Sequence, residues 1–159
     1  MTHLRLAGRG RLTDGALVTW SVAEGARGRR WRWTLATGEG SLIHSALIEL
    51  DAAGSFMRLE LETATGLLTL HPGPDGTTVH GNVVRADRVD PISVAWSPTT
   101  TVALQDDPFG SAVAGWSGSG WVINRDLTIG EGSLDRPTPT LDARGIPILV
   151  DANEWPLEV

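Results

Sequence analysis

Two tryptophans and two arginines alternate in the segment Arg30-Trp31-Arg32-Trp33. Successive side chains of a β-strand point to opposite faces, so this spacing places both indoles on one face and both guanidinium groups on the other. Indoles are suited to lining apolar cavities, and the planar fork of arginine binds carboxylate or phosphate through paired hydrogen bonds. The segment therefore predicts a strand with an apolar face and a basic face.

Two interpretations of this segment stay open. In the first, the indoles line a ligand cavity and the arginines contact a ligand headgroup or an acid on an adjacent strand. In the second, Trp31 and Trp33 belong to the core, and the arginines pair across strands with acids such as Glu60 or Glu62, which is an ordinary arrangement in sheets.

Arg125 is a charged residue on a face that alternation otherwise makes apolar, together with Trp121, Ile123, Leu127 and Ile129. A charge in such a position needs a partner or a cavity. Either a bulge turns Arg125 outward, or its side chain enters a ligand cavity and binds an anion, since a slip of one residue exchanges the two faces.

Two further polar residues, His80 and Asn82, share a face opposite Val79 and Val83. They are placed to orient a polar group of a ligand, or to face solvent. The predicted ligand-binding residues are Trp31, Trp33, Arg30, Arg32, His80, Asn82, Trp96 and Arg125.

The sequence lacks the patterns of the common catalytic and metal sites. The four histidines show no HxH or HExxH spacing and no cysteine accompanies them, so we expect no metal site. His44 shares a face with Ala46 and Ile48 and is expected to be a hydrogen-bonded core histidine. Residues 115–121 do not match the nucleophile motif G-x-S-x-G, and they favour a hairpin that places Trp116 opposite Trp121. No phosphate-binding loop occurs, and we expect neither a cofactor nor a catalytic residue.

The chain has 159 residues, no lysine and a formal net charge of −6. This length predicts one domain spanning residues 1–159, and the negative charge argues against a nucleic acid partner. The charge is uneven, because residues 1–32 contain seven arginines and two acids, whereas the rest contains six arginines and seventeen acids. The basic end is suited to an anionic headgroup or to the protein's own acidic face.

Composition also bears on the compartment. No stretch approaches eighteen consecutive apolar residues, so no transmembrane helix is expected. The first residues, MTHLRLAGRGRL, lack the apolar region of a secretory signal, and we expect a soluble cytoplasmic protein. The absence of cysteine excludes disulfides and thiolate nucleophiles.

Alternation with a period of two recurs from residue 15 to beyond residue 120, and no long window has the spacing of an amphipathic helix. The sequence therefore predicts an all-β fold with at most one short helix near 108–114, where Asp107 is a suitable cap. About ten short strands are expected, over residues 16–22, 29–35, 41–50, 56–62, 66–71, 77–85, 92–97, 100–104, 120–129 and 146–150.

The connections between these segments are too short for helical crossovers, so neighbouring strands should pair antiparallel as a meander. Turn residues occupy 37–40, 51–54 and 72–76. A sheet with so many strands has two edges to protect, and closure removes them. We therefore expect a single antiparallel β-roll or barrel, an architecture that can enclose one small ligand.

The basic tryptophan strand (Arg30-Trp31-Arg32-Trp33) and the hairpins that follow it, over roughly residues 16–130, resemble a bacterial glycolipid-binding family of β-rolls. Trp31, Trp33 and the hairpin 56–71 correspond best. The family's later Thr-Pro-Phe-Thr-Asn stretch is missing, and Asp106-Asp107-Pro108-Phe109 stands in its region. The resemblance implies binding of a glycolipid.

These observations predict non-enzymatic binding of an amphiphilic, lipid-like small molecule, with tryptophans around its apolar part and Arg or His at its polar part. One alternative is a carbohydrate- or protein-interaction module that uses exposed tryptophans. Another is a hydrolase built from a histidine with nearby carboxylates. A homodimer is compatible with each of these functions.

Overall fold

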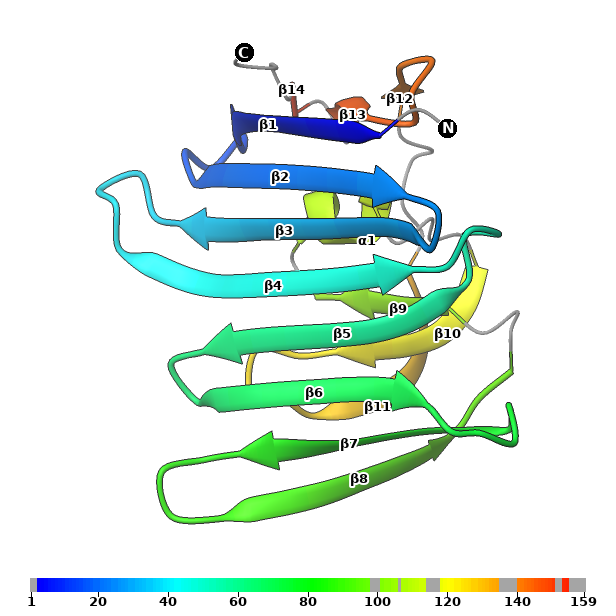
Figure 1. Ribbon diagram of the computed structural model, residues 1–159. Helices are drawn as coiled ribbons and strands as arrows, with labels where there is room; N and C mark the ends of the chain where they lie inside the picture. Colours follow the sequence, from blue (N-terminus) through cyan, green and yellow to red (C-terminus); the bar gives the residue numbers. More distant parts are fainter. Residues whose placement is uncertain are drawn as a thin grey trace.

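A computed structural model describes residues 3–97, 101–105, 107–113, 118–134, 140–150 and 153–154 (Figure 1). Its largest element is an eight-stranded sheet in which every strand pairs antiparallel with the next along the chain. The strands are β1 (Leu4–Arg11), β2 (Leu17–Gly25), β3 (Gly28–Ala36), β4 (Leu42–Leu50), β5 (Phe56–Thr63), β6 (Gly66–Pro72), β7 (Thr78–Val84) and β8 (Val89–Ala95). The predicted all-β meander is confirmed.

Short turns set this order. The turn after β3 is closed by the N–H of Thr37 donating to the carbonyl of Ser41, and the turn after β6 by the N–H of Gly73 donating to the carbonyl of Thr78. The turn between β5 and β6 requires glycine, because Gly66 has a φ of +152° and a Cβ there would lie 2.2 Å from the carbonyl oxygen of Val84.

A second layer covers one face of the large sheet (Figure 1). It contains β9 (Thr101–Leu104), α1 (Pro108–Val113), β10 (Gly118–Ile123) and β11 (Ile129–Leu134). In this three-stranded sheet β10 lies between β11, which is antiparallel to it, and β9, which is parallel to it. The short helix expected near 108–114 is confirmed.

The last described strands form a small third sheet next to β1 (Figure 1). They are β12 (Thr140–Leu141), β13 (Pro147–Val150) and β14 (Asn153–Glu154). Arg29 at the start of β3 ties this region to the large sheet by donating to the carbonyl oxygens of Arg144, at 2.7 Å, and Gly145.

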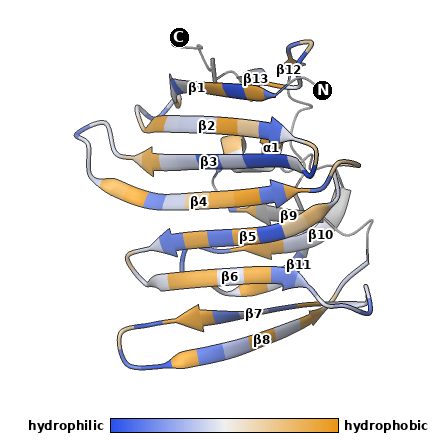
Figure 2. Cartoon of the chain, viewed as in Figure 1, coloured by the Kyte–Doolittle hydropathy of each residue, from blue (hydrophilic) through white to orange (hydrophobic). Residues whose placement is uncertain are grey.

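The core lies between the large sheet and the second layer. Apolar and polar residues alternate along the strands (Figure 2), and the apolar set faces inward. On β2, for example, Val18, Trp20 and Val22 are buried, whereas Thr19 and Ser21 are exposed. We call the covered side the inner face of the sheet and the opposite side its outer face.

The structure differs from the sequence predictions in five respects. Strands β9 and β10 pair parallel, with α1 between them, although neighbouring strands were expected to pair antiparallel. Residues 4–11, which were not assigned, form β1. The segment 120–129 is not one strand but parts of β10 and β11 joined by a turn. Within the described residues the large sheet is open, with β1 and β8 at its edges, so closure into a barrel is not confirmed.

The fifth difference concerns the hairpin expected at residues 115–121. Residues 114–117 lie outside the described residues, but Gly118 already belongs to β10, and Trp121 stands opposite Glu131 of β11 and Val102 of β9. Residues 118–120 therefore belong to a strand and not to the expected four-residue turn, and Trp116 itself lies outside the described residues. No helix of the described chain is long and apolar enough to span a membrane.

Candidate functional site

The eight residues predicted to bind a ligand do not form one cluster. Trp31 and Trp33 lie on the inner face of β3 and are buried, and Trp96 is buried just after β8. Arg30, Arg32, His80 and Asn82 occupy the outer face, and Arg125 lies in a turn. The large sheet thus separates the predicted indoles from Arg30, Arg32, His80 and Asn82, whereas Arg125 belongs to the second layer.

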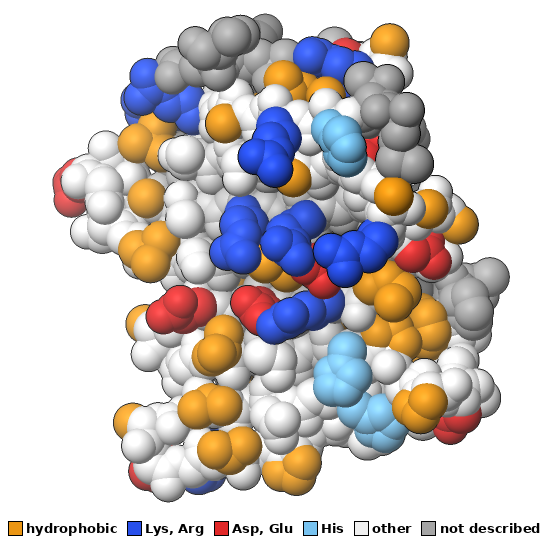
Figure 3. Space-filling view, viewed as in Figure 1, with side chains coloured by type: hydrophobic (Ala, Val, Ile, Leu, Met, Phe, Trp, Pro, Cys, Tyr) orange, Lys and Arg blue, Asp and Glu red, His pale blue; other side chains and the backbone are white. Residues whose placement is uncertain are grey.

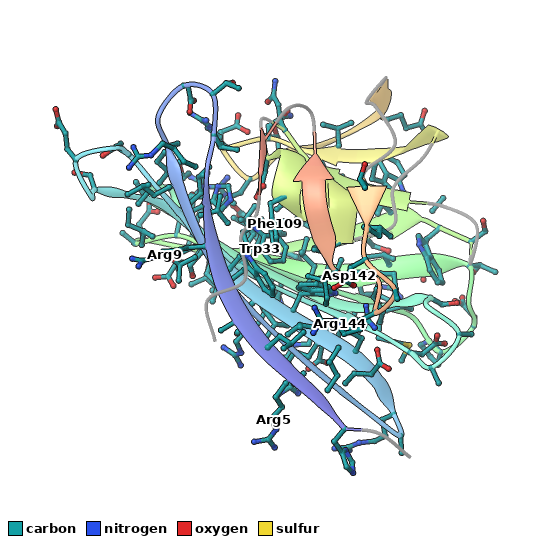
Figure 4. All side chains as sticks on the ribbon, turned by 90° about the horizontal axis from the view of Figure 1, so that it is seen from above. Arg5, Arg9, Trp33, Phe109, Asp142 and Arg144 are labelled. Atoms are coloured by element: carbon teal, nitrogen blue, oxygen red, sulfur yellow. The ribbon has the colours of Figure 1, made fainter. Side chains whose placement is uncertain are left out.

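An aromatic cluster forms where α1 packs against β2 and β3. Its centre is Phe109, whose ring centroid lies 5.7 Å from that of Trp33 and 5.9 Å from those of Trp20 and Trp31. The ring planes make angles of 28° to 80°, and tilted arrangements of this kind suit the aromatic quadrupole. Figure 4 shows Trp33 and Phe109 together on the inner side of the sheet.

Asp107 is the polar centre of the same region, and its side chain is fully buried. Its Oδ1 accepts a hydrogen bond from the N–H of Gly110 at 2.8 Å, which caps α1 as the sequence predicted. Its Oδ2 accepts from the indole N–H of Trp33 at 2.7 Å and lies 2.7 Å from Nε2 of His44. Because an ionised carboxylate only accepts hydrogen bonds, Nε2 of His44 is the donor in this contact.

Burial alone would raise the pKa of Asp107, since an apolar interior disfavours the charged carboxylate. The hydrogen bond and positive potential of His44 act in the opposite direction, helped by the N–H donors of Gly110 and Trp33. These interactions prevail, and the pKa of Asp107 lies below its ordinary value. Asp107 is therefore a buried carboxylate at neutral pH.

A histidine hydrogen-bonded to a carboxylate is one arrangement that acid–base catalysis uses. Here, however, His44 is only 3 % exposed and Asp107 is not exposed at all. Both carboxylate oxygens are already engaged by groups of the sheet and of α1. This network fastens α1 and Phe109 to the inner face, and the expectation of a hydrogen-bonded core His44 is confirmed.

Two buried indole N–H groups have no acceptor within the described structure, Nε1 of Trp20 and Nε1 of Trp96. Trp20 is 2 % exposed and stacks with Phe109, and Trp96 is 9 % exposed and contacts Phe56 at a centroid distance of 6.3 Å. Leaving such a donor without a partner costs about 1–3 kcal/mol. Both donors are therefore suited to an oxygen atom that approaches through the apolar layer.

Trp121 provides a contrast. It is half-buried on β10, and its indole N–H donates to the carbonyl oxygen of Ala95 at 2.9 Å, which links the second layer to the end of β8. Its polar atom is satisfied by the protein itself.

On the outer face, Arg30 forms an ion pair with Glu49, with Nε 2.6 Å from Oε1. The two residues stand directly opposite in the register of β3 and β4. A cross-strand ion pair was one of the two interpretations of Arg30, but its partner is Glu49 instead of Glu60 or Glu62. Glu60 lies one strand further and pairs with Arg58 of its own strand.

His80 and Asn82 lie on the outer face of β7. Nε2 of His80 is 2.8 Å from the hydroxyl of Thr78, and the ring centroid is 6.4 Å from that of His71 on β6. Asn82 is exposed between Thr69 and Pro91 on the flanking strands. Neither side chain reaches the aromatic cluster on the other side of the sheet.

Arg125 is exposed in the turn that joins β10 to β11. The turn is closed by the N–H of Asn124 donating to the carbonyl of Thr128, and Leu127 adopts a φ of +67°. Arg125 is therefore not part of an apolar strand face; of the two alternatives, its exposed position fits the outward-facing one and not entry into an internal cavity.

Two residues of the aromatic cluster, Trp20 and Phe109, were absent from the predicted site. Trp20 carried a usable signal, because it alternates with Val18 and Val22 on one face of a predicted strand. Phe109 gave none, since its place against the sheet depends on how α1 packs.

Within the described part of the chain, no three histidine or acidic residues are grouped closely enough to hold a metal ion. In comparisons with known proteins, no family model, no curated protein and no solved structure matches this chain.

Proposed function

We propose that the protein binds an amphiphilic small molecule, such as a glycolipid, between the inner face of the large sheet and the second layer. The ligand's apolar part contacts the aromatic and aliphatic side chains of this layer, and its oxygen atoms accept hydrogen bonds from indole N–H groups. The observation that carries the proposal is the pair of buried, unpartnered donors, Nε1 of Trp20 and Nε1 of Trp96.

The burial of the tryptophans favours this function over an interaction module with exposed indoles. Trp20, Trp31, Trp33 and Trp96 are each at most 9 % exposed, so none of these four offers a stacking platform to solvent. The buried and fully engaged pair of His44 and Asp107 likewise gives no support to a hydrolase. The resemblance to a glycolipid-binding family agrees with this proposal. We further propose that the protein acts in the cytoplasm. That it forms a homodimer stays a prediction.

The test is thermal unfolding of the purified, delipidated protein with and without added fatty acids, phospholipids and glycolipids. A ligand that binds only the folded state at a hundred times its Kd adds about 2.7 kcal/mol of stability. For a chain of this size that corresponds to a rise in Tm of about 5–10 °C. If no amphiphile changes either the Tm or the tryptophan emission, the proposal is wrong.

Two variants locate the polar group of the ligand. Trp20→Phe and Trp96→Phe each remove one N–H and keep an aromatic ring, so loss of one hydrogen bond should weaken binding about 2- to 10-fold. Trp121→Phe is the matched control, because its N–H is already used by Ala95. Equal effects of all three substitutions would contradict the assignment of the donors.

A further inference from the structure

The outer face of β1, β2 and β3 carries an ordered group of arginines. The register places Arg5 of β1 and Arg30 of β3 on either side of Ala23, and places Arg32 in the neighbouring row beside Ser21. Arg9 lies opposite Thr19 in the row after that. We call Arg5, Arg9, Arg30 and Arg32 the arginine face.

The strand between the arginines of β1 and those of β3 carries small outward side chains. The outward residues of β2 between them are Thr19, Ser21 and Ala23, all exposed. Neighbouring strands are about 4.8 Å apart and residues i and i+2 about 6.7 Å apart, so β1 and β3 hold the guanidinium groups in rows about 10 Å apart. Figure 3 shows arginine side chains gathered over this part of the surface, and Figure 4 shows Arg5 and Arg9 pointing away from the core.

The positive charge of this face is only partly compensated. On the outward positions of β1, β2 and β3 there is no acidic residue, and on the adjacent strand β4 Glu49 pairs with Arg30. Arg5 and Arg32 are exposed and form no ion pair with a described residue. The arginine face is thus a basic area on a chain whose formal net charge is −6.

We propose that the arginine face docks the protein onto a membrane surface that contains anionic phospholipids. The planar forks of Arg5 and Arg32 suit bidentate contacts with headgroup phosphates, and the hydroxyl groups of Thr19 and Ser21 lie between the two rows as further donors. This surface is on the opposite side of the sheet from the aromatic cluster, so docking is independent of amphiphile binding.

The limited width of the basic area favours a membrane over a nucleic acid. Glu60 and Glu62 stand outward on β5, only two strands beyond β3. A duplex has phosphates at fixed, close intervals and would place some of them against these acids. Lipids diffuse laterally, so anionic headgroups can gather beneath the arginines while uncharged lipids face the acids.

The experiment measures binding to vesicles of phosphatidylcholine alone and of phosphatidylcholine mixed with phosphatidylglycerol in equal parts. The wild-type protein is expected to bind only the mixed vesicles, and to dissociate at high salt because screening shortens the range of the attraction. Each arginine near an anionic surface contributes about a five-fold increase in partitioning, so R5Q/R32Q should bind about 30-fold more weakly.

The matched control is R88Q/R144Q, which removes the same charge from exposed arginines elsewhere. Arg88 pairs with Asp90 in the β7–β8 region, and Arg144 pairs with Asp142 near β13. This control should bind mixed vesicles like the wild type. An unchanged Tm would show that R5Q/R32Q still folds.

Three results would overturn the proposal: no binding of the wild type to mixed vesicles, equal losses in R5Q/R32Q and R88Q/R144Q, or tighter binding to a DNA duplex than to vesicles. Failure here is distinguishable from failure of amphiphile binding. Trp20→Phe should retain vesicle docking and bind amphiphile more weakly, whereas R5Q/R32Q should do the reverse.

Discussion

Asp107→Ala is expected to destabilise the protein by about 3–5 kcal/mol. The substitution removes the cap of α1, a loss of about 0.5–2 kcal/mol. It also leaves the buried N–H of Trp33 without its acceptor, at about 1–3 kcal/mol, and removes the partner of His44. These two losses sum to about 1.5–5 kcal/mol, and the loss of the His44 partner adds to them, which agrees with the roughly 3–5 kcal/mol expected when one member of a buried, hydrogen-bonded pair is removed.

Urea unfolding followed by tryptophan emission measures this loss, because Trp33 and its aromatic neighbours report directly on the region. Asp75→Ala is the matched control: Asp75 also accepts a backbone N–H, that of Thr77 at 3.0 Å, but it lies in an exposed turn. Its effect should be a small fraction of that of Asp107→Ala. Equal losses of stability in the two variants would refute the view that Asp107 fastens α1 to the sheet.

Three further predictions follow from the same contacts. The folded-state pKa of Asp107 is lowered, so the ionised side chain stabilises the fold above the unfolded-state pKa near 3.9, and this stabilisation is lost as the pH falls through the folded-state pKa. In urea titrations, the difference in unfolding free energy between wild type and D107N should therefore shrink below about pH 4. Gly66→Ala should cost about 2–3 kcal/mol by thermal unfolding, because its methyl group would meet the carbonyl of Val84, and a neutral result would disprove the clash. A double-mutant cycle on Arg30 and Glu49 should give a coupling of only about 0.2–1 kcal/mol, and a larger value would mean that the pair is less solvated than its exposure indicates.

The strands of the large sheet were largely predictable because each buries one face, which imposes the period of two that the sequence displays. Strand β1 escaped prediction for a physical reason. Its inward positions include Gly8 and Gly10, which are buried but carry no apolar side chain. The alternation of apolar and polar side chains that identifies β2 and β3 is therefore missing from the part of β1 that contains Gly8 and Gly10.

The candidate site was less predictable because it depends on tertiary contacts. His44 and Asp107 are 63 positions apart, and nothing in their local sequence indicates that they meet. Arg125 was assigned to a strand because its turn contains no glycine and places Leu127, an apolar residue, at a positive φ. The partner of Arg30 depends on the register between β3 and β4, which places Arg30 opposite Glu49 and which the local sequence does not reveal.

Native mass spectrometry of the purified protein tests amphiphile binding most directly. The account predicts that the wild-type protein retains an adduct of the mass of a lipid, and that W20F or W96F retains less of it than W121F does. If the wild-type spectrum contains only the bare chain, both as purified and after incubation with amphiphiles, the central claim is contradicted.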